Sequence, residues 1–157
     1  MIRVAVAQVG SVLFDTPSTL CRVEALCRKA ATSGAQLLVF PEALLGGYPR
    51  GMTFGATIGN RTIAGRELFR RYSLSAIQCP GPEPEILTSW AKELSLHLVI
   101  GAVERERSTL YCSSLILSPE KGLLSKHRKL MSIGSERLIW GLGDGSTMDN
   151  VGYFSHI

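Results

Sequence analysis

The segment "QLLVFPEALLGGYPRG", residues 36–51, places an acidic side chain directly after an apolar stretch. "QLLVF" has the near-continuous apolar character of a strand that is covered on both faces. Glu42 follows this stretch after Pro41, which restricts one backbone angle. Ligands of open α/β sheets bind beyond the carboxyl ends of the strands, so Glu42 is a candidate general base in such a crevice. The alternative is a carboxylate at a helix start, stabilised by the helix dipole.

A second candidate lies in "SKHRKLMSIGSERLIWGLGDGST", residues 125–147, which includes four consecutive basic or imidazole side chains. On a strand, alternate side chains share a face, which groups Lys126 with Arg128. His127 and Lys129 then lie on the opposite face. A lysine turned inward beside an acid is costly unless it does electrostatic work, such as stabilising an oxyanion. The alternative is a solvated basic strand at a sheet edge, which resists aggregation.

The elements that must position these side chains begin with a strand and a helix. Residues 2–9 alternate β-branched and small side chains and predict a strand inside a sheet. Thr16 and Pro17 predict an N-cap followed by proline at the first helical position, with Gly34 as the stop. The inward face of this helix is expected to carry Leu20, Val23, Leu26, Cys27 and Ala30.

The rest of the chain continues the pattern. Residues 46–65 hold six glycines and predict an ordered loop, followed by a short helix over 66–74. Residues 79–85 are typical of a turn and a helix start. The inward face of that helix is expected to carry Ile86, Leu87, Trp90, Ala91 and Leu94. Further strands are expected over 96–105, 109–118 and 123–130. The order β-α-β-α-α-β-β-β indicates an α/β domain.

Composition limits the functional classes. The 157 residues are 45% hydrophobic and 19% charged, which predicts one domain with a sizeable core. The net charge of +4 and the 7% aromatic content do not favour nucleic-acid binding. Arg70, Arg71 and the basic run at 126–129 keep that function as a weaker alternative. Neither a membrane span nor a signal peptide is predicted, so no membrane partner is expected.

The four cysteines are scattered without a CxxC pair, which predicts free thiols in a reducing, cytoplasmic environment. Cys21 and Cys27 are expected to pack on the first helix. Cys112 is expected to be a small buried side chain in a strand. Cys79 lies in a loop and is expected to be the most exposed of the four.

Together, "AVAQVG", "LLVFPEALLGGYPRG" and "KHRKLMSIGSERLIWGLGDGST" resemble the nitrilase branch of the carbon–nitrogen hydrolase superfamily. The resemblance runs from Ile2 to about Met148. Residues 1–148 are therefore expected to form an incomplete carbon–nitrogen hydrolase domain, and residues 149–157 an unmatched tail. The resemblance implies an α-β-β-α sandwich, no metal or organic cofactor, and face-to-face self-association. It also implies hydrolysis of a small-molecule nitrile or amide by a Glu-Lys-Cys triad.

The resemblance assigns roles to individual residues. Glu42 matches the general base of the family's FPE motif, and Lys129 matches the catalytic lysine of its HRKL motif, in preference to Lys126. Glu136, in "SERL", matches a glutamate that positions the reacting groups. "GGYPRG" matches a loop that borders the pocket, where Tyr48 either lines the pocket or packs as an ordinary tyrosine.

The family's nucleophile lies in a segment resembling "CWEN", which does not occur in these 157 residues. The chain is therefore expected to be the N-terminal part of a nitrilase and to be inactive alone, with none of its four cysteines as a substitute. Uncovered apolar faces and an open sheet edge predict marginal stability or a partner such as full-length nitrilase. The alternatives are an inactive isoform that joins full-length nitrilase, or a relative of the cyanide hydratase or amidase type.

Overall fold

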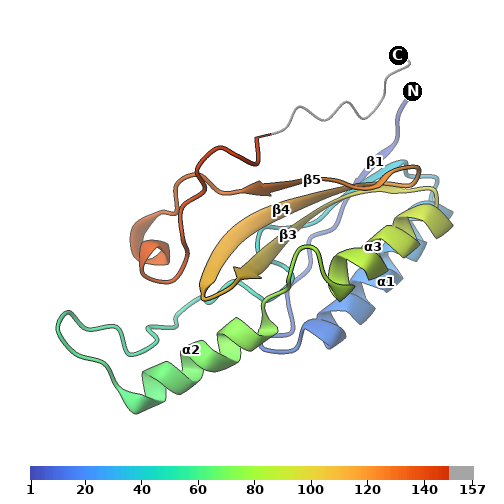
Figure 1. Cartoon of the computed structure of the whole chain (residues 1–157). Helices are drawn as coiled ribbons and strands as arrows, with labels where there is room; N and C mark the ends of the chain where they lie inside the picture. The colour runs from blue at the N-terminus through green and yellow to red at the C-terminus, as the bar shows by residue number, and fades with distance from the viewer. Residues whose placement is uncertain (149–157) are drawn as a thin grey trace.

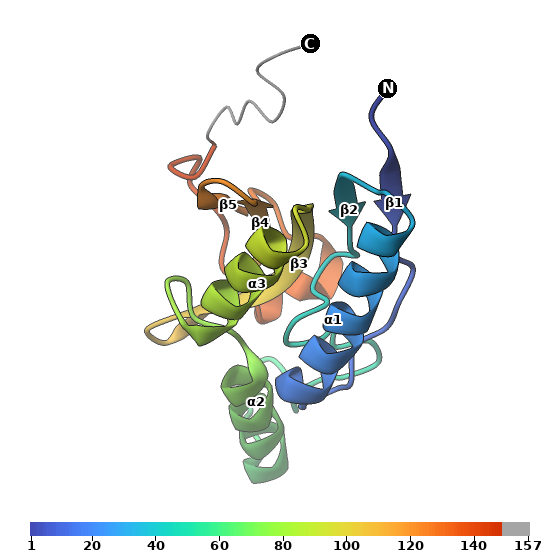
Figure 2. The same cartoon turned by 90° about the vertical axis from the view of Figure 1, so that its right-hand side faces the viewer.

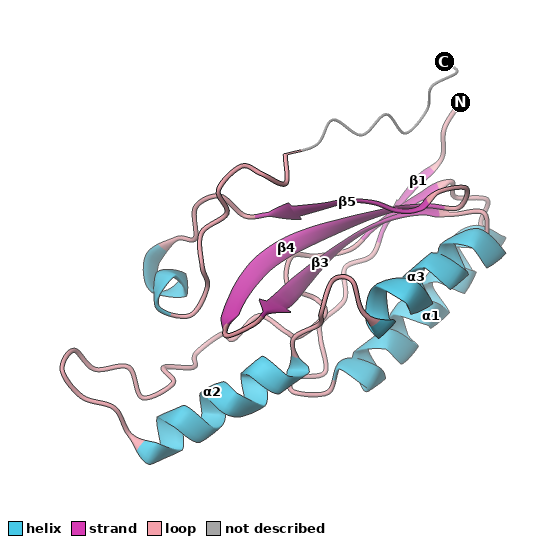
Figure 3. Cartoon of the chain, viewed as in Figure 1, coloured by secondary structure: helices cyan, strands magenta, loops and turns pink. Residues whose placement is uncertain are grey.

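The computed structural model describes residues 1–148 (Figure 1, Figure 3). The elements follow in the order β1 (Val4–Val6), α1 (Thr16–Thr32), β2 (Leu37–Val39), α2 (Ile63–Ser75), α3 (Pro82–Glu93), β3 (His97–Glu106), β4 (Thr109–Ser118), β5 (Gly122–Arg128) and the 3-10 helix η1 (Gly134–Leu138). This order of strands and helices confirms the predicted α/β class. The expected tail, residues 149–157, lies outside the described residues.

The strands form one mixed sheet in the order β1-β2-β3-β4-β5. The first three strands are parallel because helices connect them, and the last two are added as antiparallel hairpins. β1 is thus an edge strand, which corrects the prediction that it lies inside a sheet. One face of β1 is also uncovered, since Val4 is 52% and Val6 78% exposed. β5 forms the other edge.

Helices α1 and α3 lie side by side on one face of the sheet (Figure 2). The predicted inward face of α1 is confirmed: four of the five residues are buried, and Leu26 packs against the same core. On α3, Leu87 and Ala91 are buried as predicted. Ile86 is instead 38% exposed, because the buried stripe is narrow and centred on Pro84, Leu87 and Ala91.

The starts of α1 and α2 also differ from the predictions. Asp15, and not Thr16, caps α1, because its carboxylate accepts a hydrogen bond from the Ser18 N–H at 2.9 Å. α2 begins three residues earlier than the predicted helix, at Ile63. Its cap is Thr62, whose hydroxyl accepts a hydrogen bond from the backbone of the third helical residue at 3.0 Å.

A second, smaller core lies on the face of the sheet opposite α1 and α3. Its buried residues are Ala43, Tyr72, Ala76, Val103, Leu110, Cys112 and Trp140. They come from the loop after β2, from α2 and the residue that follows it, from β3 and β4, and from the segment after β5. This core therefore anchors the two segments that carry Glu42 and Lys129.

The loop after β2 is held tightly against β3 at Gly101. The Gly101 N–H donates to Pro41 O at 3.2 Å, and the Leu45 N–H donates to Gly101 O at 3.2 Å. A Cβ atom at position 101 would lie 2.5 Å from the Cα of Glu42 and 2.4 Å from Pro41 O. A glycine is therefore required for the backbone around Glu42 to approach the sheet this closely.

We expect Gly101→Ala to displace the Glu42 loop and to lower the free energy of unfolding by about 1–3 kcal/mol, as other overpacked sites do. Urea denaturation followed by tryptophan fluorescence measures this loss. Gly10→Ala is the matched control, because a Cβ atom at Gly10 meets nothing within 4 Å. Equal denaturation midpoints for the two variants would contradict the packing role of Gly101.

Candidate active site

The ammonium group of Lys129 joins two carboxylates. Its Nζ lies 2.8 Å from Oε1 of Glu42 and 3.1 Å from Oε2 of Glu136. Lys129 follows directly after β5, Glu136 lies in η1, and Glu42 lies in the turn after β2. The structure thus brings together three residues that the sequence singled out. The helix-start alternative for Glu42 is wrong, because the next helix begins only at Ile63.

Glu136 is held by three donors. Oε2 accepts hydrogen bonds from Lys129 and from the Ile133 N–H at 3.0 Å, while Oε1 accepts one from the Tyr48 hydroxyl at 2.9 Å. The ring of Tyr48 also packs edge-on against Trp140, with 5.6 Å between ring centroids. Tyr48 therefore both packs and contacts the charged cluster.

These contacts determine the charges of Glu136 and Lys129 at neutral pH. Burial works to raise the pKa of Glu136, but the donors from Ile133, Tyr48 and Lys129 outweigh it, and the pKa falls below its usual range. The hydrogen bond to Glu42, and then that to Glu136, raise the pKa of Lys129 despite its partial burial. At neutral pH, Lys129 is therefore a fixed cation beside a fixed anion.

Glu42 is the most open member of the cluster. Its side chain is 50% exposed, compared with 27% for Lys129 and 8% for Glu136. Its Oε1 accepts the hydrogen bond from Lys129, whereas within residues 1–148 its Oε2 accepts none. The carboxylate is therefore anchored through one oxygen and has the other available on the open side.

Cys112 reaches the same carboxylate, a contact that the sequence did not predict. Its thiol donates to Oε1 of Glu42 at 3.4 Å, and it is buried as predicted. Burial, and then the charge of Glu42, raise the pKa of Cys112 to about 12, so the thiol is protonated at neutral pH. The pairing of the last two predicted strands could have indicated this contact, because it brings Cys112 beside Lys129. The Lys129 N–H donates to Cys112 O at 2.8 Å.

The other cysteines correct two predictions. Cys27 is buried on α1 as expected, but Cys21, on the same helix, is exposed. Cys79 is only partly exposed, so it is not the most exposed of the four. Its loop is covered from the β5 side, where the Lys126 ammonium donates to Cys79 O at 3.4 Å.

The opposite face of β5 carries a separate ion cluster. Glu104 is 1% exposed and accepts hydrogen bonds from Lys126 at 2.5 Å and from Arg128 at 2.6 and 2.9 Å. This confirms that Lys126 and Arg128 share a face. It also corrects the solvated-strand alternative for these two residues, whose side chains are only 20% and 15% exposed. Lys129, and not Lys126, is the lysine at Glu42.

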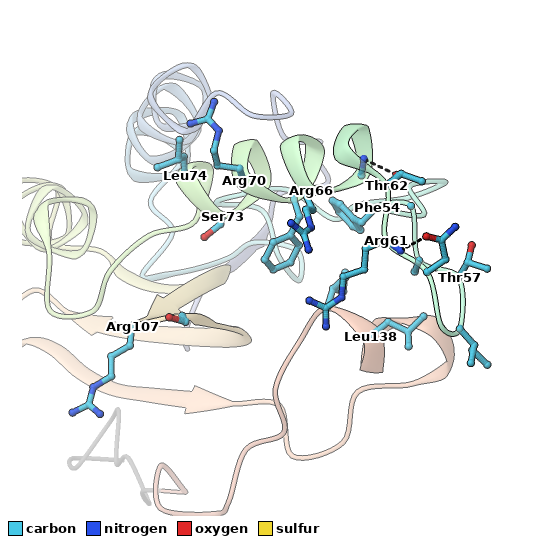
Figure 4. Close-up of a pocket in the computed structure, with 18 residues that line it drawn as sticks. Phe54, Thr57, Arg61, Thr62, Arg66, Arg70, Ser73, Leu74, Arg107 and Leu138 are labelled. Carbon is cyan, nitrogen blue, oxygen red and sulfur yellow. Dashed lines mark hydrogen bonds between the residues drawn. The ribbon is translucent and has the colours of Figure 1, made fainter.

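One cavity adjoins the cluster, and a second lies beyond it. One of about 430 Å³ is lined by Tyr48 and Glu136 together with the 49–54 loop and residues of η1. A larger one of about 860 Å³ lies beyond it against α2 (Figure 4). Residues 1–148 contain no group of three or more His, Cys, Asp or Glu side chains placed to hold a metal ion. None of the helices in this part of the chain is long and apolar enough to cross a membrane.

The model of the carbon–nitrogen hydrolase family matches residues 3–151, and the chain belongs to that family. The chain is 51% identical over 147 residues to the bifunctional nitrilase/nitrile hydratase NIT4A of Nicotiana tabacum. It is 49% identical over 147 residues to nitrilase 3 of Arabidopsis thaliana. Each match covers 94% of this chain and 42% of the relative, so the chain spans less than half the length of these curated relatives.

Solved structures confirm the fold. An amidase from Nesterenkonia sp. matches with a TM-score of 0.65 at 16% identity, over 91% of this chain and 48% of that chain. An N-terminal amidase with a Gln-Val peptide matches with a TM-score of 0.66 at 20% identity, over 90% of this chain and 31% of that chain. The sheet and helices thus have the arrangement expected for part of a nitrilase-type sandwich.

We expect Lys129→Met to raise the pKa of Glu136 towards that of an ordinary carboxyl group, because the variant removes one of the donors that lower it. The titration of labelled glutamate carboxyl groups by carbon NMR measures this pKa. Lys126→Met is the matched control, since Lys126 contacts Glu104 on the other face. A Glu136 pKa that is the same in both variants would refute the coupling to Lys129.

Proposed function

We propose that this chain contributes the general base and the charge-stabilising lysine of a nitrilase-type hydrolase site. In this proposal Glu42 is the base and Lys129 the electrostatic catalyst, Glu136 positions Lys129, and Tyr48 borders the substrate pocket. The observation that carries the proposal is the 2.8 Å contact between Lys129 Nζ and Glu42 Oε1. The close relationship to nitrilases supports the choice of reaction.

The residue types suit this chemistry. Glu42 takes the proton of a cysteine thiol, and the thiolate attacks the carbon of a nitrile. Lys129 stabilises the negative charge that develops on the nitrogen. Glu42 passes the thiol proton to this nitrogen, which gives a thioimidate. Water then adds to the thioimidate carbon, ammonia leaves, and a thioester remains. A second water, activated by Glu42, hydrolyses the thioester to a carboxylic acid and frees the thiol. In this proposal Oε2 of Glu42 accepts the proton while Oε1 stays bound to Lys129, which is supported by the lack of a hydrogen bond to Oε2 within residues 1–148.

We propose further that the 157 residues are catalytically incomplete alone, because they contain no CWEN-like segment. Cys112 is the cysteine nearest to Glu42, but its pKa of about 12 leaves almost no thiolate at neutral pH. Its sulfur is also covered, with the residue only 4% exposed. A buried, protonated thiol is a poor substitute for an activated nucleophile.

We also propose the cytosol as the location of the chain.

A chimera tests the proposed roles. We expect the chain alone to release no more ammonia from aryl or aliphatic nitriles than its Glu42→Gln variant. Residues 2–148, placed before the remaining C-terminal part of the tobacco relative, are expected to hydrolyse nitriles. Glu42→Gln or Lys129→Met in the chimera should each lower kcat by about a hundredfold or more.

Lys92→Met, at an exposed position at the end of α3, is the matched control and should leave kcat unchanged. Full activity of the Glu42→Gln chimera would exclude Glu42 as the base. Ammonia release by the isolated chain that depends on Cys112 would overturn the proposal that it is incomplete.

A second candidate function is association with full-length nitrilase or with another copy of the chain. The edge strand β1 exposes Val4 and Val6, and further apolar side chains are exposed after β5. These are Leu130, Met131, Ile133, Leu138, Leu142 and Met148. An open edge and apolar surface of this extent favour pairing with another chain.

We expect Val6→Lys to weaken this association, because a charge on an edge strand opposes strand pairing. Co-purification with a full-length nitrilase and sedimentation of the chain alone measure it. Ile63→Lys is the matched control, since Ile63 is 88% exposed at the start of α2, away from the edge. A chain that sediments as a monomer and does not co-purify with the full-length protein would exclude this function.

A further inference from the structure

The larger cavity is bounded by α2, by the 54–62 loop and by the end of η1 (Figure 4). Its volume of about 860 Å³ falls within the range of small-molecule sites, roughly 300–1,000 Å³. Glu42, Lys129 and Glu136 do not line it. It is therefore distinct from the charged cluster of the candidate active site.

One side of this cavity is apolar and packs against the second core. Phe54 packs edge-on against Phe69 of α2, with 5.8 Å between ring centroids, and tilted against Tyr72 at 5.4 Å. Gly65 lets the loop lie against α2, because a Cβ atom there would be 2.2 Å from Phe54 O. Leu138 contributes to the opposite wall. The aromatic side chains of the cavity are therefore held in position by their own packing, without a ligand.

The charge on the lining has one sign. The eighteen lining residues include four arginines, at positions 61, 66, 70 and 107, and no aspartate or glutamate. Arg70 is paired with Glu67 at 2.7 Å. Arg61 and Arg66 form no ion pair with any acid in the described part of the chain, and both extend into the space between α2 and Leu138 (Figure 4).

We infer that this cavity binds an organic carboxylate that carries an apolar body. A guanidinium group presents parallel N–H donors that match a carboxylate, and two such groups here face aromatic and aliphatic walls. Inorganic phosphate would satisfy the charge but would leave the apolar walls of Phe54, Phe69 and Leu138 in water. The inference does not depend on the roles proposed for Glu42 and Lys129, although a carboxylate is also what nitrile hydrolysis releases.

Calorimetry with the full chain and 3-phenylpropanoate as probe tests the inference. We expect the anion to bind at least about tenfold more tightly than the neutral 3-phenylpropanamide or the ring-free propanoate. Arg61→Gln and Arg66→Gln should each weaken binding about tenfold, and Arg61→Lys by less, because it keeps the charge but loses the fork. Circular dichroism of each variant establishes that it is folded.

Two control variants distinguish binding in this cavity from a general charge effect and from binding at the candidate active site. Arg22→Gln removes one positive charge from α1, and Lys129→Met changes the candidate active site; both should bind the probe as the wild type does. Equal affinity for the acid and the amide would overturn the inference, as would loss of binding in Lys129→Met but not in the Arg61 and Arg66 variants. Binding of an acidic peptide without binding of 3-phenylpropanoate would also overturn it and would indicate a macromolecular partner.

Discussion

The ammonium group of Lys129 joins the end of β5 to η1, seven residues further on, and to the loop after β2, 87 residues earlier in the chain. The Lys129 side chain is only 27% exposed, so its ammonium group has lost part of its solvation. Without Glu42 and Glu136, no opposite charge would compensate for that loss. With both acids present the cluster carries a net negative charge, and the Tyr48 hydroxyl and the Ile133 N–H offset part of it at Glu136. The two acids therefore differ. Glu136 is buried and held by three donors, whereas Glu42 is half-exposed and bound to Lys129 through one oxygen.

Lys129 takes its direction from the strand that precedes it. Arg128 forms a bidentate contact with the buried Glu104 on the helix-covered face, and this orients the end of β5. Burial works to raise the pKa of Glu104, but the donors from Arg128, Lys126 and Ser113 outweigh it and lower the pKa overall. Glu104 therefore stays charged and maintains its hydrogen bonds with Arg128. The next residue along the chain is directed to the opposite face, where Glu42 lies.

The sequence alone predicted those features that depend on local pattern. The order of elements, the buried stripe of α1 and the grouping of Lys126 with Arg128 all follow from periodicity, and all are present. Features that depend on tertiary pairing were not predictable in the same way. The edge position of β1 is decided by which strands pair, and not by the composition of residues 2–9.

The contact between Cys112 and Glu42 shows the same limit within the site. A cysteine in a strand predicts burial, which the structure has. Which side chain its thiol meets depends on the strand register and on the path of the loop after β2, and no single strand encodes these. Glu42 likewise resembled a helix-start residue because proline and an acid are typical of both settings. Only the packing of its loop on Gly101 places it at the sheet instead.

The two cavities have a common wall, which gives the catalytic cluster and the proposed carboxylate site a shared structural element. Phe54, Leu138 and Ile139 line both. Leu138 is the last residue of η1, the short helix that carries Glu136 and through it holds Lys129. A ligand against Leu138 therefore contacts the same short helix that carries Glu136. The buried Trp140, whose N–H donates to Glu136 O at 2.8 Å, also holds this helix, so the shared wall stays in place without Lys129.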